Sequence, residues 1–192
     1  MLIIILVIIA VIVVLIYTTY NGLVTAKVRV DQSWKDIDIQ LKKRYDLLPD
    51  LVETAKKATA LDEKILTEVT RLRSEGMKVA ATESTPAKRS QIEGQISSMM
   101  RDIKIQVEAY PDIKSHGELQ SLMDSVSDIE DKIAYARQFY NANTGEYNTK
   151  VRVFPAVLIA GMLGFKSAEY FEAPEEERKD VKVDFSETSN KG

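Results

Sequence analysis

The sequence has no cysteine and a single histidine, and these two shortages narrow the chemistry open to it. Without cysteine the chain has no disulfides, thiolate metal sites, cysteine nucleophiles or lipid-modified cysteines. One imidazole, that of His116, excludes zinc sites built from several histidines and the paired Glu-x-x-His motifs of di-iron bundles. His116 lies in a Ser-His-Gly-Glu run typical of a helix start, so we interpret it as a solvated residue of a capping turn.

Glycine and proline are also scarce, at 8 and 5 of 192 residues, and the body is rich in strong helix formers. Lysine and arginine number 26 against 29 acidic residues, spread along the chain, which argues against a nucleic-acid surface. No P-loop, Rossmann glycine pattern, His-Glu-x-x-His motif or nucleophile elbow occurs. We therefore expect a helical protein that is not an enzyme and needs no metal or other cofactor.

The first 20 residues carry no charged side chain. As a helix they would span about 30 Å, the thickness of a bilayer core, with Tyr17 and Tyr20 at the interface. A cleaved signal peptide is the alternative, but no basic region precedes the apolar run, and Thr-Thr-Tyr-Asn-Gly is a poor cleavage site. We predict a retained transmembrane anchor over residues 1–20, in contact with membrane lipid.

Basic residues follow the anchor closely, at Lys27, Arg29, Lys35, Lys42, Lys43 and Arg44. By the positive-inside tendency, the body then lies in the cytoplasm and the N-terminus points outward. The predicted location is the inner (cytoplasmic) membrane, crossed once. The opposite orientation, with a periplasmic body, stays open at this point.

The longest periodic pattern runs from Ser115 to Asn148. Reading every third or fourth residue gives the stripe Leu119, Leu122, Val126, Ile129, Ile133, Ala136, Tyr140, Asn143 and Tyr147, apolar except at Asn143. Spacings of three and four place these residues on one stripe of a helix about 50 Å long. Ser115 and Glu118 form a capping box at its start. So narrow a stripe needs other long helices to cover it.

Three further helical segments are predicted, one from residue 21 onward and two over residues 61–79 and 86–110. The first has its apolar positions from Val30 to Ala55 and is expected to continue out of the membrane segment without a break. Pro49 is expected to bend or end the first, Ser84 or Thr85 to cap the third, and Pro111 to stop it. The expected fold is all-α: an N-terminal transmembrane helix followed by an antiparallel (up-and-down) bundle of long helices over residues 21–172. Residues 173–192 read as a polar, acidic and partly disordered tail.

The segment from Val151 to Phe165 is different, because twelve uncharged residues run together from Phe154 to Phe165. As a helix they would extend about 18 Å, which is too short to cross a membrane. The segment therefore either covers one end of the bundle or lies along the membrane face. Bundle cover is the favoured interpretation.

Polar residues interrupt the apolar stripes in two places. Asn143 stands on the long stripe, near Arg137, Asn141 and Asn148, and the pair Tyr-Asn repeats after seven residues. A second group, near Pro49, comprises Arg44, Asp46 and Asp50. We predict a hydrogen-bonded polar layer that locks helix against helix. The functional alternative is a partner or small-ligand site on the bundle.

Several short motifs occur in a fixed order along the chain. They are Arg44-Tyr-Asp-Leu-Leu-Pro-Asp-Leu-Val52, Tyr110-Pro111, Ala136-Arg-Gln-Phe-Tyr-Asn141, Tyr147-Asn148 and Phe154-Pro155. Their order and spacing resemble the LemA family of bacterial membrane proteins over residues 21–171. The resemblance implies one N-terminal transmembrane helix and a cytoplasmic antiparallel helical bundle, and magnetosome-associated relatives suggest work at membranes. It implies no enzymatic activity and supplies no catalytic residues.

The sequence thus favours a membrane-anchored scaffold or interaction protein that forms homo-oligomers, docks an unknown protein partner and organises or shapes the membrane. The alternative is a membrane-tethered sensing or binding module. Its ligand or partner site would lie between helices near Arg137 and Asn141.

Overall fold

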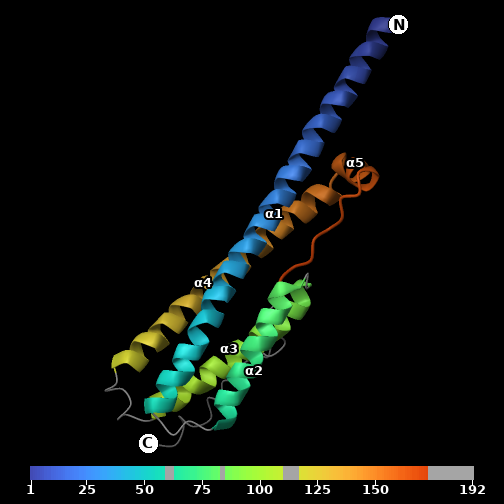
Figure 1. Ribbon diagram of the computed structural model, residues 1–192. Coiled ribbons are helices and arrows are strands. Elements are labelled where there is room, and N and C mark those ends of the chain that lie inside the picture. Colours follow the sequence, from blue (N-terminus) through green and yellow to red (C-terminus); the bar gives the residue numbers. More distant parts are fainter. Residues whose placement is uncertain (59–62, 83–84, 110–116, 173–192) are drawn as a thin grey trace, which may run out of the picture.

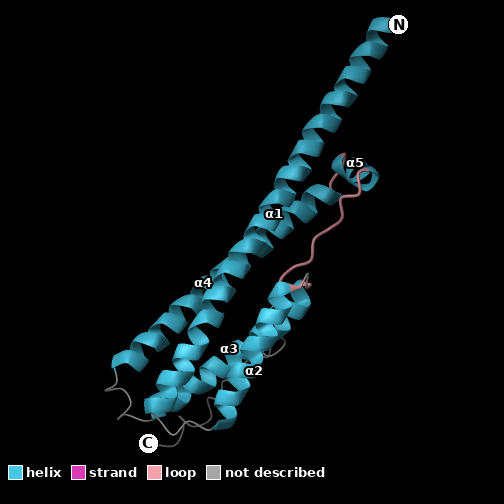
Figure 2. Cartoon of the chain, viewed as in Figure 1, coloured by secondary structure: helices cyan, strands magenta, loops and turns pink. Residues whose placement is uncertain are grey.

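The computed structural model describes residues 1–58, 63–82, 85–109 and 117–172. These residues form five helices: α1 (Leu2–Ala58), α2 (Glu63–Ala81), α3 (Pro86–Ala109), α4 (Gly117–Arg152) and α5 (Ala156–Met162) (Figures 1 and 2). The all-helical prediction is confirmed. The predictions for the capping turn at Ser115 and His116, the cap at Ser84, the helix end at Pro111 and the tail 173–192 lie outside the described residues. At α3, the backbone N–H of Lys88 bonds the Thr85 hydroxyl, so Thr85 serves as the cap.

Helix α1 joins the apolar N-terminal run to the bundle without a break (Figure 1). Among the described helices it alone has the length and composition to cross a membrane; its most apolar 18-residue window has a mean hydropathy of 3.3 and no buried residues. Side chains become buried from Leu23 onward, where α1 packs antiparallel to α4. The N-terminal part of α1 therefore projects beyond the bundle with its side chains uncovered.

Pro49 does not end α1, which continues to Ala58, so that part of the prediction is wrong. A proline inside a helix leaves the carbonyl four residues earlier without its usual partner. Here that carbonyl belongs to Tyr45, and it accepts a hydrogen bond of 2.8 Å from the Nε of Arg73 on α2. A side chain from the neighbouring helix thus replaces the bond that proline removes.

The core is one continuous cluster in which α1 and α4 form the main pair and α2 and α3 form a second pair. The stripe predicted for α4 is buried as expected at most positions, including Leu119, Val126, Ile133 and Tyr147. It differs at two positions, because Met123 is buried while Leu122 is only half-buried, and Thr144 is fully buried while Asn143 is only half-buried. A straight helix repeats every 3.6 residues rather than 3.5, so the inward position shifts from one residue to its neighbour.

Gly76 of α2 lies against the ring of Tyr45, so replacing it with alanine should destabilise the protein. A Cβ there would stand 2.8 Å from the Tyr45 hydroxyl oxygen and 2.9 Å from Cζ. Tyr45 cannot easily move, because its hydroxyl bonds Glu93. We expect Gly76→Ala to lower the free energy of unfolding by about 1–3 kcal/mol, although such a change in a helix normally stabilises by about 1 kcal/mol.

The measurement is urea unfolding of the full-length protein in detergent micelles, followed by helical circular dichroism. Gly22→Ala is the matched control, because a Cβ at Gly22 has open space around it. It should leave stability unchanged or raise it. If Gly76→Ala also raised stability, the close contact between α1 and α2 would be refuted.

Candidate interaction sites

A buried ionic cluster forms around Arg44, whose side chain is 1% exposed. Its Nη1 donates to the Ser97 hydroxyl at 2.9 Å and to the Glu130 carboxylate at 2.6 Å, and its Nη2 bonds Glu93. The Tyr45 hydroxyl donates to the other oxygen of Glu93. Burial raises the pKa of Tyr45, although the positive charge of Arg44 lowers it in part. The raised pKa keeps the Tyr45 hydroxyl protonated, so it acts as a hydrogen-bond donor. The cluster joins α1, α3 and α4.

Of the polar group predicted near Pro49, only Arg44 belongs to this cluster. Asp46 and Asp50 are exposed on α1 and do not join it. The partners that sequence reasoning missed are on α3 and α4. A signal for them did exist: Arg89, Glu93 and Ser97 recur every four residues and so share one face of α3.

Arg89 forms a second buried ionic contact one helical turn from Glu93. It pairs with Asp38 of α1, and its guanidinium lies 5.3 Å from the centre of the Trp34 ring. Burial raises the pKa of Asp38, while the positive charge of Arg89 lowers it in part. Trp34 also packs against Tyr140 and Phe171, with ring centres 5.2 and 6.1 Å apart. Trp34 is therefore a packing residue between α1, α4 and the returning chain.

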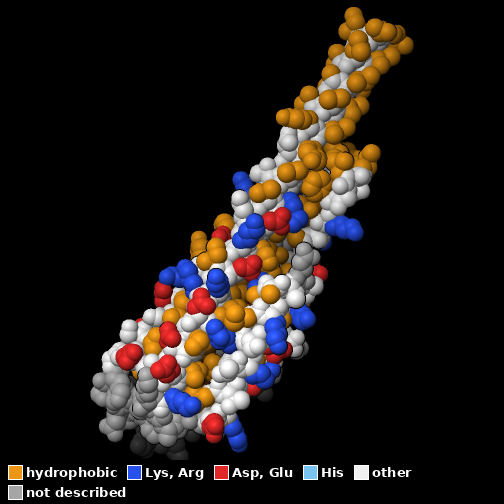
Figure 3. Space-filling model, in the orientation of Figure 1, with side chains coloured by type: hydrophobic (Ala, Val, Ile, Leu, Met, Phe, Trp, Pro, Cys, Tyr) orange, Lys and Arg blue, Asp and Glu red, His pale blue; other side chains and the backbone are white. Residues whose placement is uncertain are grey.

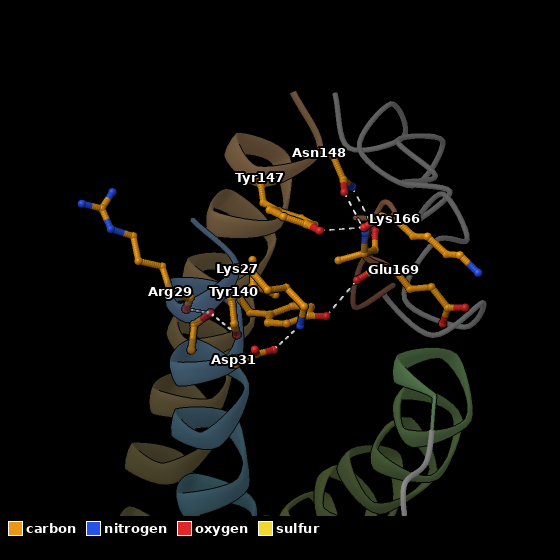
Figure 4. A network of polar contacts seen from close by, with 11 residues as sticks. Lys27, Arg29, Asp31, Tyr140, Tyr147, Asn148, Lys166 and Glu169 are labelled. Carbon is orange, nitrogen blue, oxygen red and sulfur yellow. Dashed lines mark hydrogen bonds and ion pairs between the residues drawn. The ribbon is translucent and has the colours of Figure 1, made fainter. Parts of the chain in front are cut away.

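After a turn at residues 163–164 the chain returns along α4 as an extended strap, residues 165–172 (Figure 1). The Asn148 amide makes two hydrogen bonds with the backbone of Ala168, accepting at 2.8 Å and donating at 2.9 Å. The Asn141 amide does the same with Phe171. Just before each asparagine, a tyrosine hydroxyl donates to a strap carbonyl: Tyr147 to Lys166 and Tyr140 to Glu169 (Figure 4).

The Tyr-Asn repeat has a simple geometrical basis. Seven residues of helix rise about 10.5 Å, and three residues of extended chain cover about 10 Å. The two Tyr-Asn pairs on α4 therefore match strap positions three residues apart, at Lys166 and Glu169 and at Ala168 and Phe171. At its far end the strap also receives a hydrogen bond from Ser90 of α3 to the carbonyl of Glu172.

The residues of the predicted polar layer therefore do not form one layer: Arg44 belongs to the buried ionic cluster, and others contact the strap. Asn141 and Asn148 bind the strap, and Arg137 lies 5.6 Å from the centre of the Phe171 ring. The Nδ2 of Asn143 is buried without a hydrogen-bond partner among the described residues. The position between helices near Arg137 and Asn141 is occupied by the strap of the chain itself.

The described residues contain no group of three or more histidine or acidic side chains arranged to hold a metal ion. The buried carboxylate of Glu93 and the half-buried one of Glu130 both bond Arg44. These bonds connect α1 with α3 and α4, so we interpret the two carboxylates as parts of a structural ion cluster.

An exposed aromatic pair lies on α4, on the side away from Asn141 and Asn148. The rings of Tyr135 and Phe139 stack at 6.5 Å with an angle of 7° between their planes. Tyr135 is 70% exposed and Phe139 47%. Together with Asp36 and Gln40 of α1 they line a surface groove. Stacked aromatics of this exposure are typical anchors of protein interfaces.

Comparison with known proteins places the chain in a family. The sequence profile of the LemA family matches residues 33–185. The chain is 27% identical to magnetosome protein MamQ 2 of Paramagnetospirillum magneticum over 175 residues, covering 80% of this chain and 64% of the relative. It is 24% identical to magnetosome protein MamQ of Magnetospirillum gryphiswaldense over 174 residues, covering 79% and 64%. It is 25% identical to protein LemA of Metamycoplasma hominis over 170 residues, covering 88% and 75%.

The chain therefore spans less than two thirds of the length of the magnetosome relatives. The family profile covers most of the helical bundle, including the Arg44 cluster and the strap residues that bind Asn141 and Asn148. On this match, the chain belongs to the LemA family.

Proposed function

We propose that this protein is a membrane-anchored scaffold that presents a helical bundle at the cytoplasmic face of the inner membrane, without catalysing a reaction. The observation that carries the proposal is the continuity of α1 from the anchor into the core. No loop separates the two parts, so the anchor holds the bundle in a fixed direction relative to the bilayer. The basic residues after the anchor support the inward orientation.

The proposed action of the scaffold is self-association through the exposed pair Tyr135 and Phe139. These side chains have apolar rings in solvent beside a groove, and burying them against a second copy would be favourable. An assembly of identical anchored bundles, all oriented alike, could organise or shape the membrane beneath it and dock further proteins.

Self-association predicts a defined assembly larger than a monomer when the intact protein is extracted in mild detergent and its mass is measured. The double variant Tyr135→Ala/Phe139→Ala should shift this species to monomer without loss of helicity. The control is Met77→Ala/Ile105→Ala, which removes exposed apolar side chains from α2 and α3. A monomeric wild-type protein at high concentration would refute the oligomeric scaffold.

Removing residues 1–20 distinguishes contacts between anchors from contacts between bundles as the cause of assembly. If the assembly collapses without the anchor, the bilayer segment builds it; if it persists, the contact lies on the bundle. The sensing alternative near Arg137 and Asn141 is not favoured, because the strap already uses the Asn141 amide and covers Arg137 with Phe171.

A further inference from the structure

The segment from Val153 to Phe165, which includes α5, does not hide its apolar side chains. Within it only Ala160 is fully buried, at 1% exposure, where α5 touches α1 and α4. Large apolar side chains with 43–86% exposure are Val153, Phe154, Val157, Leu158, Met162 and Leu163. The expectation that the segment covers the end of the bundle therefore accounts for one face of α5 and leaves the other unexplained.

The position of this segment along α1 indicates what meets the exposed face. The Phe165 ring packs edge-on against the Tyr20 ring, with centres 6.1 Å apart. Tyr20 ends the predicted anchor, residues 1–20, where an aromatic residue of a membrane span meets the lipid headgroups. Phe165 thus brings α5 to the level at which the anchor leaves the membrane. In the space-filling view the apolar surface continues from α1 onto α5 (Figure 3).

The charges around the segment fit the same place. No charged residue occurs between Arg152 and Lys166, and both of these side chains are exposed. A short apolar element with a basic residue at each end is suited to a bilayer interface, where the apolar side chains enter the acyl boundary and the basic ones reach phosphate groups.

We propose that residues 153–165 are a second membrane-contacting element, lying in the interface of the bilayer that the anchor crosses. This goes beyond the proposed scaffold function. A single helix through a membrane leaves its attached domain free to turn about the helix axis. A second contact beside it fixes that rotation, so every copy presents the same face sideways to its neighbours.

The test uses the absence of cysteine in the chain, which makes single-cysteine variants unambiguous. Full-length Leu158→Cys and Met162→Cys proteins are labelled with an environment-sensitive fluorophore and placed in vesicles of phosphatidylcholine and phosphatidylglycerol. We expect blue-shifted emission and at least twofold quenching by lipids that carry a spin label near the headgroup. Tyr17→Cys is the positive control, and Gln138→Cys, exposed on α4, should be quenched only by aqueous iodide.

Quenching of the two α5 labels by iodide alone would overturn the proposal. A blue shift that grows with protein concentration but resists the lipid quencher would also overturn it, because a second copy would then cover the face. Either result leaves the scaffold function intact, since that function is judged by the mass of the assembly.

Discussion

Replacing Arg44 with methionine is expected to lower the free energy of unfolding by about 3–5 kcal/mol. Arg44 pairs with both Glu93 and Glu130, and Glu93 is 2% exposed. Methionine fills similar space but donates no hydrogen bond, so the Glu93 carboxylate would stay buried with the Tyr45 hydroxyl as its remaining bond. The cost arises from the unpaired acid rather than from the lost attraction itself.

Urea unfolding of the full-length protein in detergent micelles measures this effect. Lys43→Ala is the control, because Lys43 is the exposed neighbour of Arg44 on the same helix and should change stability by less than about 0.5 kcal/mol. Adding Glu93→Gln to Arg44→Met should recover part of the loss, since a neutral amide is less costly to bury. Equal destabilisation by the single and double variants would show that the buried charge is not the cause.

The helices and their inward faces could be predicted from the sequence because apolar periodicity is a local property. The inward face of α4, for example, follows from the spacing of Leu119, Val126 and Ile133 alone, without knowledge of the helix that packs against it. The effect of Pro49 could not be predicted in this way. Whether a helix survives an internal proline depends on a partner for the released carbonyl. Here that carbonyl belongs to Tyr45, and its partner, Arg73, is 28 residues away on another helix.

The polar contacts of the Arg44 cluster and of the strap also divide into a part that the sequence predicts and a part that it does not. The sequence predicts a structural role for Arg44, Asn141 and Asn148 because each of these polar residues stands close to an apolar stripe. The sequence does not predict the partners of Arg44, because Glu93 and Glu130 are 49 and 86 residues away along the chain. The seven-residue Tyr-Asn repeat suggested a helix partner. The structure instead shows an extended strap, whose backbone has no periodic side-chain pattern to reveal it.

Because the strap is held by amide side chains, Asn141→Ala/Asn148→Ala should release it while the helices stay folded. The double variant removes four hydrogen bonds to the backbone of Ala168 and Phe171, each with a net value of about 1 kcal/mol. Opening of the strap should become easier by up to about 4 kcal/mol, and hydrogen exchange at the two strap amides faster by about a hundredfold or more.

Hydrogen exchange of the full-length protein in micelles measures this release, with Gln138→Ala as the control on an exposed position of α4. The single variants should each accelerate mainly the amide that faces them, Phe171 for Asn141 and Ala168 for Asn148. Release of the strap also removes Phe171 from Trp34, so the Trp34 fluorescence should shift toward that of a more hydrated indole. If both amides kept their protection in the double variant, packing of Phe171 rather than the asparagine amides would be what holds the strap to α4.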